Sequence, residues 1–206
     1  MKRKLFEQLL NELKLQTNFS IISVKLLNEH FSKFGQNKPG TEEDINSKYM
    51  FWYSIQNYVV SLANISKLLF GVKGYASKEE WDKRKEERRQ FREILNISES
   101  TLLKNKEMRN LLEHIDENVE KFSLETSTYV VDRNIGTSNM IMLHDNNFFD
   151  KNYYNLRNYL TDKQEFWLFN KKFSITETFP EILDLRDTII TTEKTLKEGG
   201  YDALFD

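Results

Sequence analysis

The sequence contains no cysteine, which excludes disulfides, thiolate metal sites and cysteine nucleophiles and which suits a reducing compartment. Histidine is scarce as well. His30, His114 and His144 are the three histidines, and they are too far apart in the sequence to have the close ligand spacing of a zinc site. We therefore expect neither a bound metal nor another cofactor.

Long apolar runs are also missing. The most apolar segment, residues 58–70, is interrupted by Ser61, Asn64 and Lys67, and it falls short of the ~20 apolar residues that span a bilayer. The basic residues 2–4 are not followed by the apolar stretch of a secretory signal. A net charge of -2, from 30 basic and 32 acidic residues, gives no overall attraction to nucleic acid or to an anionic membrane. We expect a cytoplasmic protein with no membrane partner.

The length of 206 residues slightly exceeds that of a common domain. We take residues 1–206 as a single domain, although two very small domains would also fit this length. Hydrophobic residues make up 39% of the chain and aromatic residues 13%, which is enough for a sizeable core and which argues against disorder.

Apolar residues recur at helical spacing in five parts of the chain. The first part predicts one long helix or two consecutive helices. Capping patterns begin the second helix, at Thr41 and Asp44, and the third, at Ser77 and Glu80, while Pro180 favours the start of the last one. The predicted helices cover about residues 5–34, 43–70, 78–95, 100–122 and 178–199.

Short apolar runs bounded by Asn, Gly and Asp begin after Ser127 and favour extended structure. The predicted strands are residues 129–131, 140–143, 158–160, 166–169 and 172–175. The predicted fold class is therefore mainly α. We expect an antiparallel helical bundle with a small β-meander, about residues 127–176, inserted before the last helix.

Polar residues gather in the middle of the fourth predicted helix. Arg109, Asn110 and His114 lie largely off its apolar stripe. Asn110 and His114 share a face because they are four residues apart, whereas Arg109 lies about 140° around the helix from His114 and must reach back. A histidine can give or take a proton near neutral pH, and an arginine donates in a fork that matches phosphate.

Arginine, a polar residue, three further positions and histidine, on a late helix of an all-α bundle, resemble the HEPN ribonuclease motif. The resemblance covers about residues 1–125 and the last helix, and it leaves out the β appendage. It implies a homodimer that brings two motifs into one metal-independent site for cleaving RNA, with Arg109, Asn110 and His114 as the catalytic residues. It also fits a toxin or defence component with an antitoxin-like protein partner.

The same residues have a structural interpretation. Arg109 and Glu113 have the i, i+4 spacing of a surface ion pair on a helix, and His114 could be a buried, hydrogen-bonded histidine. The chain would then be a non-catalytic, HEPN-like helical protein that binds RNA or a protein partner.

A second basic group lies in the third predicted helix. Lys83, Arg84, Arg88 and Arg89 are candidate RNA-binding residues, because they would form a stripe able to contact phosphates. Acidic residues interleave with them, and so a solvated helix face is the alternative role.

Aromatic residues cover most of the second predicted helix. A helix that is apolar around so much of its surface fits a core together with a subunit interface, which supports a homodimer. The residues are Tyr49, Phe51, Trp52, Tyr53 and Tyr58.

Overall fold

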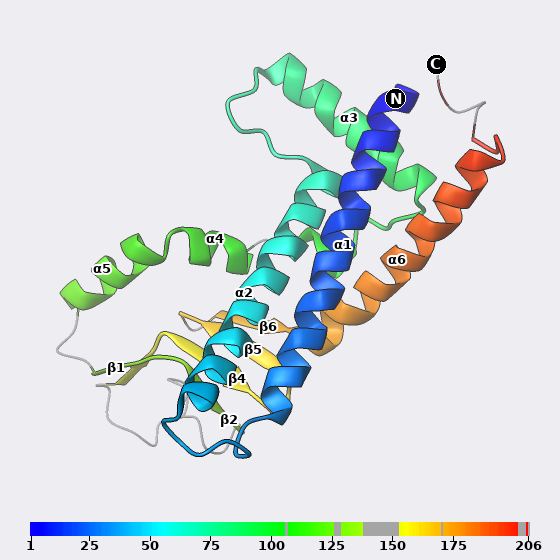
Figure 1. The fold of residues 1–206 in the computed structure, drawn as a ribbon. Coiled ribbons are helices and arrows are strands. Elements are labelled where there is room, and N and C mark those ends of the chain that lie inside the picture. The colour runs from blue at the N-terminus through cyan, green and yellow to red at the C-terminus, as the bar shows by residue number, and fades with distance from the viewer. Residues whose placement is uncertain (106, 126–128, 138–152, 170, 202–204, 206) are drawn as a thin grey trace. The chain divides into compact units, whose positions relative to one another are not determined.

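A computed structural model of the chain describes residues 1–105, 107–125, 129–137, 153–169, 171–201 and 205. The chain is mainly helical, with a small β-sheet region ahead of the last helix, so that this part of the predicted fold class is confirmed (Figure 1). It divides into two compact units, Met1–Asn105 with Pro180–Asp206, and Lys106–Phe179. The single domain expected from the length stays a prediction. Among the described residues, no helix combines the length and the apolar character needed to cross a membrane.

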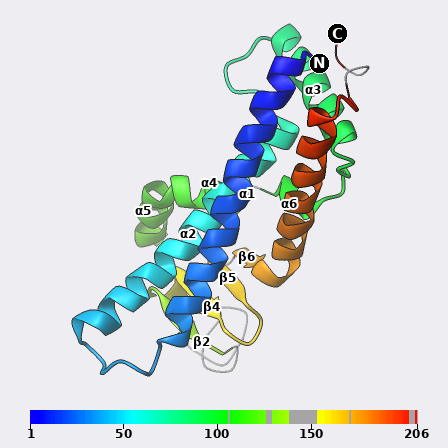
Figure 2. The same ribbon diagram turned by 45° about the vertical axis from the view of Figure 1, so that its right-hand side comes forward.

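Two long helices form an antiparallel hairpin in the first unit, α1 (Arg3–Ser32) and α2 (Glu42–Phe70) (Figures 1 and 2). Asn64 Nδ2 of α2 donates to Gln16 Oε1 of α1 at 3.2 Å, and the rings of Phe31 and Phe51 lie 6.1 Å apart. Residues near the end of α1 therefore contact residues near the start of α2, and earlier residues of α1 contact later residues of α2. The first predicted segment is one continuous helix rather than two.

Side-chain caps explain why α2 and the next helix, α3 (Lys78–Ile94), begin where the sequence predicts. The hydroxyl of Thr41 accepts the backbone N–H of Asp44, and Ser77 and Glu80 form both bonds of a capping box. Gly71 ends α2 with φ at 74°, in the left-handed region that glycine adopts without steric cost.

Two further elements pack against the hairpin within the first unit. In α3, the ring of Phe91 meets Phe6 edge to face at 5.3 Å, and the guanidinium of buried Arg92 donates to the backbone oxygen of Leu69 at 2.6 Å. Lys14 of α1 pairs with Glu193 of α6 (Ile175–Lys197) at 2.7 Å.

The prediction of a single fourth helix over residues 100–122 is wrong. The structure has a short 3-10 turn, η1 (Leu102–Lys104), then α4 (Glu107–Glu113) and α5 (Ile115–Glu125). Asn105 is extended, which ends the 3-10 turn. At the second break, the side-chain amide of Asn118 donates to the backbone oxygen of His114 at 2.8 Å and shares that acceptor with the helical N–H.

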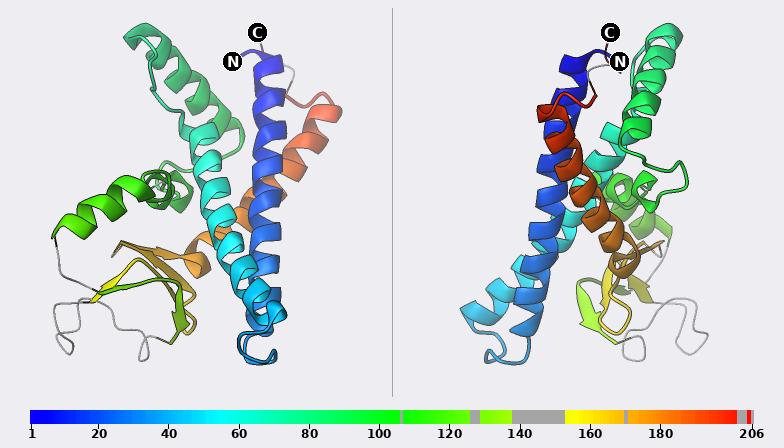
Figure 3. Two further views of the ribbon diagram at one scale, coloured as in Figure 1. Left: turned by 60° about the vertical axis from the view of Figure 1, so that its left-hand side comes forward. Right: turned by 90° about the vertical axis from the view of Figure 1, so that its right-hand side faces the viewer.

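The strands of the second unit form two sheets (Figure 3). β4 (Arg157–Leu160), β5 (Glu165–Leu168) and β6 (Lys171–Ser174) pair antiparallel in sequence order, which confirms the meander. β2 (Asn134–Gly136) adds to β4 in parallel and was not predicted.

The second sheet contains β1 (Tyr129–Val131), which was predicted, and β3 (Tyr153–Asn155), which was not; the two strands run parallel. The strand predicted over residues 140–143 lies outside the described residues.

The last helix begins about one turn earlier than predicted. Ser174 accepts the backbone N–H of Glu177 at 3.2 Å, so that α6 starts at Ile175 and Pro180 lies inside it. Ser174 and Glu177 have the spacing of a capping box, a signal that the prediction overlooked in favour of the proline.

The buried guanidinium of Arg92 gives a test of how α3 docks on α2. It lies 4.6 Å from the ring centre of Phe70 and pairs with Glu99. Arg92→Lys loses the planar fork and the stacked contact, and we expect the free energy of unfolding to fall by about 1–3 kcal/mol in urea denaturation. Arg89→Lys is the matched control, since Arg89 forms only exposed ion pairs and its replacement should cost less than about 0.5 kcal/mol. Equal losses would contradict this role of Arg92.

The carboxylate of Asp44 gives a pH-dependent prediction at the start of α2. Hydrogen bonds from Lys48 and from the backbone N–H of Gly40 lower the pKa of Asp44. A lowered folded-state pKa stabilises the protein above the ordinary value of about 3.9, and this stabilisation is lost as the pH falls through the lowered value. Asp44→Asn should therefore reduce the urea midpoint at pH 7, and the difference from the wild type should vanish in acid.

Glu43→Gln is the control for this prediction, because it removes a carboxylate from the same helical turn without removing the bonds to Gly40 and Lys48. If the two variants had the same pH dependence, the effect would belong to the helix dipole and not to these bonds.

Candidate functional site

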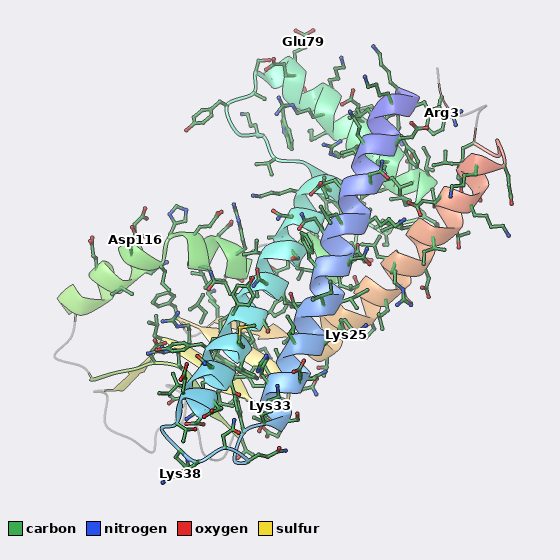
Figure 4. The ribbon with its side chains drawn as sticks, viewed as in Figure 1. Arg3, Lys25, Lys33, Lys38, Glu79 and Asp116 are labelled. Carbon is green, nitrogen blue, oxygen red and sulfur yellow. The ribbon has the colours of Figure 1, made fainter. Side chains whose placement is uncertain are left out.

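The three predicted catalytic residues lie in the second unit, on α4 and at its end. Arg109 and Asn110 belong to the helix, whereas His114 occupies the turn between α4 and α5. Backbone bonds from His114 to Asn110 and from Asn118 to His114 carry the helical pattern across this turn, at 3.2 and 3.0 Å. The junction is thus a bend in a nearly continuous helical segment, and Asp116, labelled in Figure 4, is the second residue of α5.

Arg109 forms the ion pair with Glu113 that its spacing predicts. Its side chain is only 20% exposed, and Nη1 also donates to Asn110 Oδ1 at 3.5 Å, a long bond. The arginine is therefore held against its own helix by a carboxylate and an amide.

His114 has a different environment. Its imidazole is 59% exposed, so that the interpretation as a buried histidine does not hold for this structure. Nδ1 lies 3.2 Å from Glu117 Oε1, and the backbone oxygen of His114 accepts from Asn118. Neither Glu117 nor Asn118 was among the predicted site residues, although their i+3 and i+4 spacings from His114 were visible in the sequence.

The described contacts therefore form two small groups. Arg109, Asn110 and Glu113 make up the first, and His114, Glu117 and Asn118 the second. None of the contacts recorded among the described residues joins Arg109 to His114.

The pairing of His114 with Glu117 has a chemical consequence. A carboxylate that accepts a hydrogen bond from Nδ1–H fixes the tautomer of the imidazole. Nε2 is then the nitrogen that takes or gives a proton. Because the ring is largely exposed, a substrate can approach that nitrogen.

The basic residues of α3 belong to the first unit, and Arg89 is paired with acidic neighbours. Arg89 binds both Glu86 and Glu93 of its own helix. Its hydrogen bond to Glu86 lowers the pKa of that carboxyl to about 2, and the same pairing raises the pKa of Arg89. Arg88 is partly buried, which lowers its pKa.

Of the four candidate RNA-binding residues, Lys83 and Arg84 remain exposed along with Arg89. The ion pairs of Arg89 fit a solvated helix face, whereas exposed Lys83 and Arg84 are free to contact phosphates, and the RNA-binding role of α3 stays a prediction.

Metal ligands do not gather in the described part of the chain, where no group of three or more His, Asp or Glu side chains is placed to hold an ion. His144 lies outside the described residues, and His30 is a half-buried residue of α1.

Comparisons with protein-family models, with characterised proteins and with solved structures give no match for this chain.

Proposed function

We propose that the chain is a HEPN-like, metal-independent endoribonuclease, active as a homodimer and belonging to a toxin or defence system. The observation that carries the proposal is the exposed His114–Glu117 pair, whose histidine lies at a helix bend within five residues of Arg109 and Asn110. These are the residue types that RNA cleavage without metal requires.

In the proposed reaction, Nε2 of His114 removes the proton from the 2′-hydroxyl of the substrate. The freed oxygen attacks the neighbouring phosphorus, and the 5′-oxygen leaves with a proton from an acid. Glu117 orients the imidazole and offsets the positive charge that develops on it. Arg109 donates to the phosphate oxygens as negative charge accumulates on them, and Asn110 orients the phosphate or the imidazole.

One feature of this site favours two copies of the chain. One motif supplies a single histidine, whereas the attacking and leaving oxygens need a base and an acid at the same time.

To bind a phosphate, Arg109 must first release Glu113. Such a pair on a helix contributes only about 0.3–0.5 kcal/mol, so that a phosphate can replace the carboxylate.

A specific observation favours the second candidate, a non-catalytic helical protein that binds RNA or a protein. Arg109 is satisfied by Glu113, and Arg89 is satisfied by Glu86 and Glu93. Cations neutralised within their own helices are typical of a solvated surface.

The test is incubation of the purified chain with end-labelled single-stranded RNA in EDTA. We expect cleavage by the wild type and a loss of at least about 10²-fold in rate for His114→Ala and for Arg109→Ala. His114→Ala should keep its free energy of unfolding within about 0.5 kcal/mol, because the imidazole is 59% exposed. Arg109→Ala removes a side chain that is only 20% exposed, so circular dichroism must show that this variant is folded.

His30→Ala and Arg186→Ala are the matched controls, since each removes the same side-chain type from the first unit. Cleavage that survives both site substitutions would show a contaminating nuclease. A wild type that binds RNA without cutting it would decide for the non-catalytic alternative.

A further inference from the structure

The outer side of the α1–α2 hairpin exposes large apolar side chains that no other element of the first unit covers. Each of them is between 36% and 57% exposed. We call this surface the hairpin face, and it consists of Leu15, Phe19 and Ile22 of α1 with Tyr49, Tyr53 and Val60 of α2.

Helical geometry gathers these residues into two stripes. Leu15, Phe19 and Ile22 follow one another by four and three positions, and the α2 residues by four and seven, spacings that keep each set on one line along its helix. Both stripes are displaced in the same rotational sense from the bond between Gln16 and Asn64. Because the helices run antiparallel, rotation in the same sense about each helix axis puts both stripes on the same side of the hairpin.

The sequence along this face is depleted of charge. Charged residues make up 30% of the chain, yet residues 15–24 and 49–66 contain no Asp, Glu, Lys, Arg or His. The antiparallel register sets these two segments side by side. Charge returns at Lys25 and, near the loop end of the hairpin, at Lys33 and Lys38 (Figure 4). Depletion of charge distinguishes the core of a protein interface from ordinary surface.

The exposed apolar area is of the size that a stable dimer needs. The hairpin face presents roughly 600 Å² of apolar side chain, with about 150–250 Å² taken for a fully exposed large residue. A standard interface covers about 800 Å² on each partner, and somewhat more than half of it is apolar.

We infer that the hairpin face binds the same face of a second copy of the chain, as a two-fold symmetric layer of four helices. A two-fold interface must be complementary to itself, and a neutral apolar surface meets its own copy without like charges in contact. Recognition of a different protein usually relies on complementary charge, which this face lacks. Exposed Asn18 and Gln56, within the two charge-free segments, can form hydrogen bonds across the interface.

The first experiment measures the molar mass of the full chain by light scattering at micromolar concentration. The wild type should have twice the chain mass of 24.7 kDa. Ile22→Glu and Tyr53→Glu should each give a monomer, because each buries a charge in the interface. Ile190→Glu is the matched control and should remain a dimer, since Ile190 is exposed on α6 and lies outside the hairpin face. Far-UV circular dichroism identifies any variant that fails to fold.

A second experiment uses a milder change and exploits the absence of cysteine. Ile22→Cys introduces the single thiol of the chain. Its reaction with a maleimide should be slow at high protein concentration and should accelerate on dilution, whereas the thiol of Ile190→Cys should react at one rate throughout.

A monomeric wild type would overturn the inference. If the thiol at position 22 of such a monomer were protected from maleimide at every concentration, the chain itself would cover this face. A dimer that survives both glutamate substitutions would also overturn it. The inference shares with the cleavage proposal only the expectation of a homodimer. A dimer that does not cut RNA supports the inference alone. A monomer that cuts RNA overturns both the inference and the homodimer of the cleavage proposal, and leaves only the chemistry at His114 standing.

Discussion

The packing of α1 against α2 is the constraint on which the first unit depends. An isolated helix is marginal in water, and these two are stable because each buries an apolar face along about thirty residues. The other elements of the unit are positioned by this hairpin. α3 docks where Phe91 meets Phe6 and where Arg92 reaches the backbone of Leu69, and α6 is joined to α1 through Glu193. The same packing leaves one side of each helix exposed, and over residues 15–22 of α1 and 49–60 of α2 that side carries large apolar residues.

Helix starts could be predicted accurately from the sequence where a side-chain cap was recognised. The starts of α2 and α3 were predictable to within a residue, because a cap is a local interaction between residues three apart. The break at His114 was not, since apolar periodicity continues through it and backbone hydrogen bonds cross it. The strand β2, Asn134–Gly136, has a single large apolar residue and lacks the alternation that a prediction needs.

For the candidate site, sequence reasoning could identify residue types and local pairs but not exposure. The bond between Arg109 and Glu113 follows from their spacing along one helix. The exposure of His114 does not, because it depends on the bend and on which side of α4 and α5 the second unit buries. That Arg89 pairs with both Glu86 and Glu93 could not be predicted either, because several other basic residues of the same helix could have paired with these glutamates.

The hairpin face and the candidate site belong to different units, and this separation need not weaken a site built from two copies. The second unit is joined to the first at two points, between Asn105 and Lys106 and within α6 at Pro180. A dimer formed through the first unit therefore tethers two second units to one assembly. Short tethers give effective concentrations in roughly the millimolar range, so that even a weak contact between the two motifs becomes populated. Dimerisation and catalysis can then be encoded by separate surfaces, with the charge-free hairpin providing the affinity and the polar residues around His114 remaining exposed to substrate.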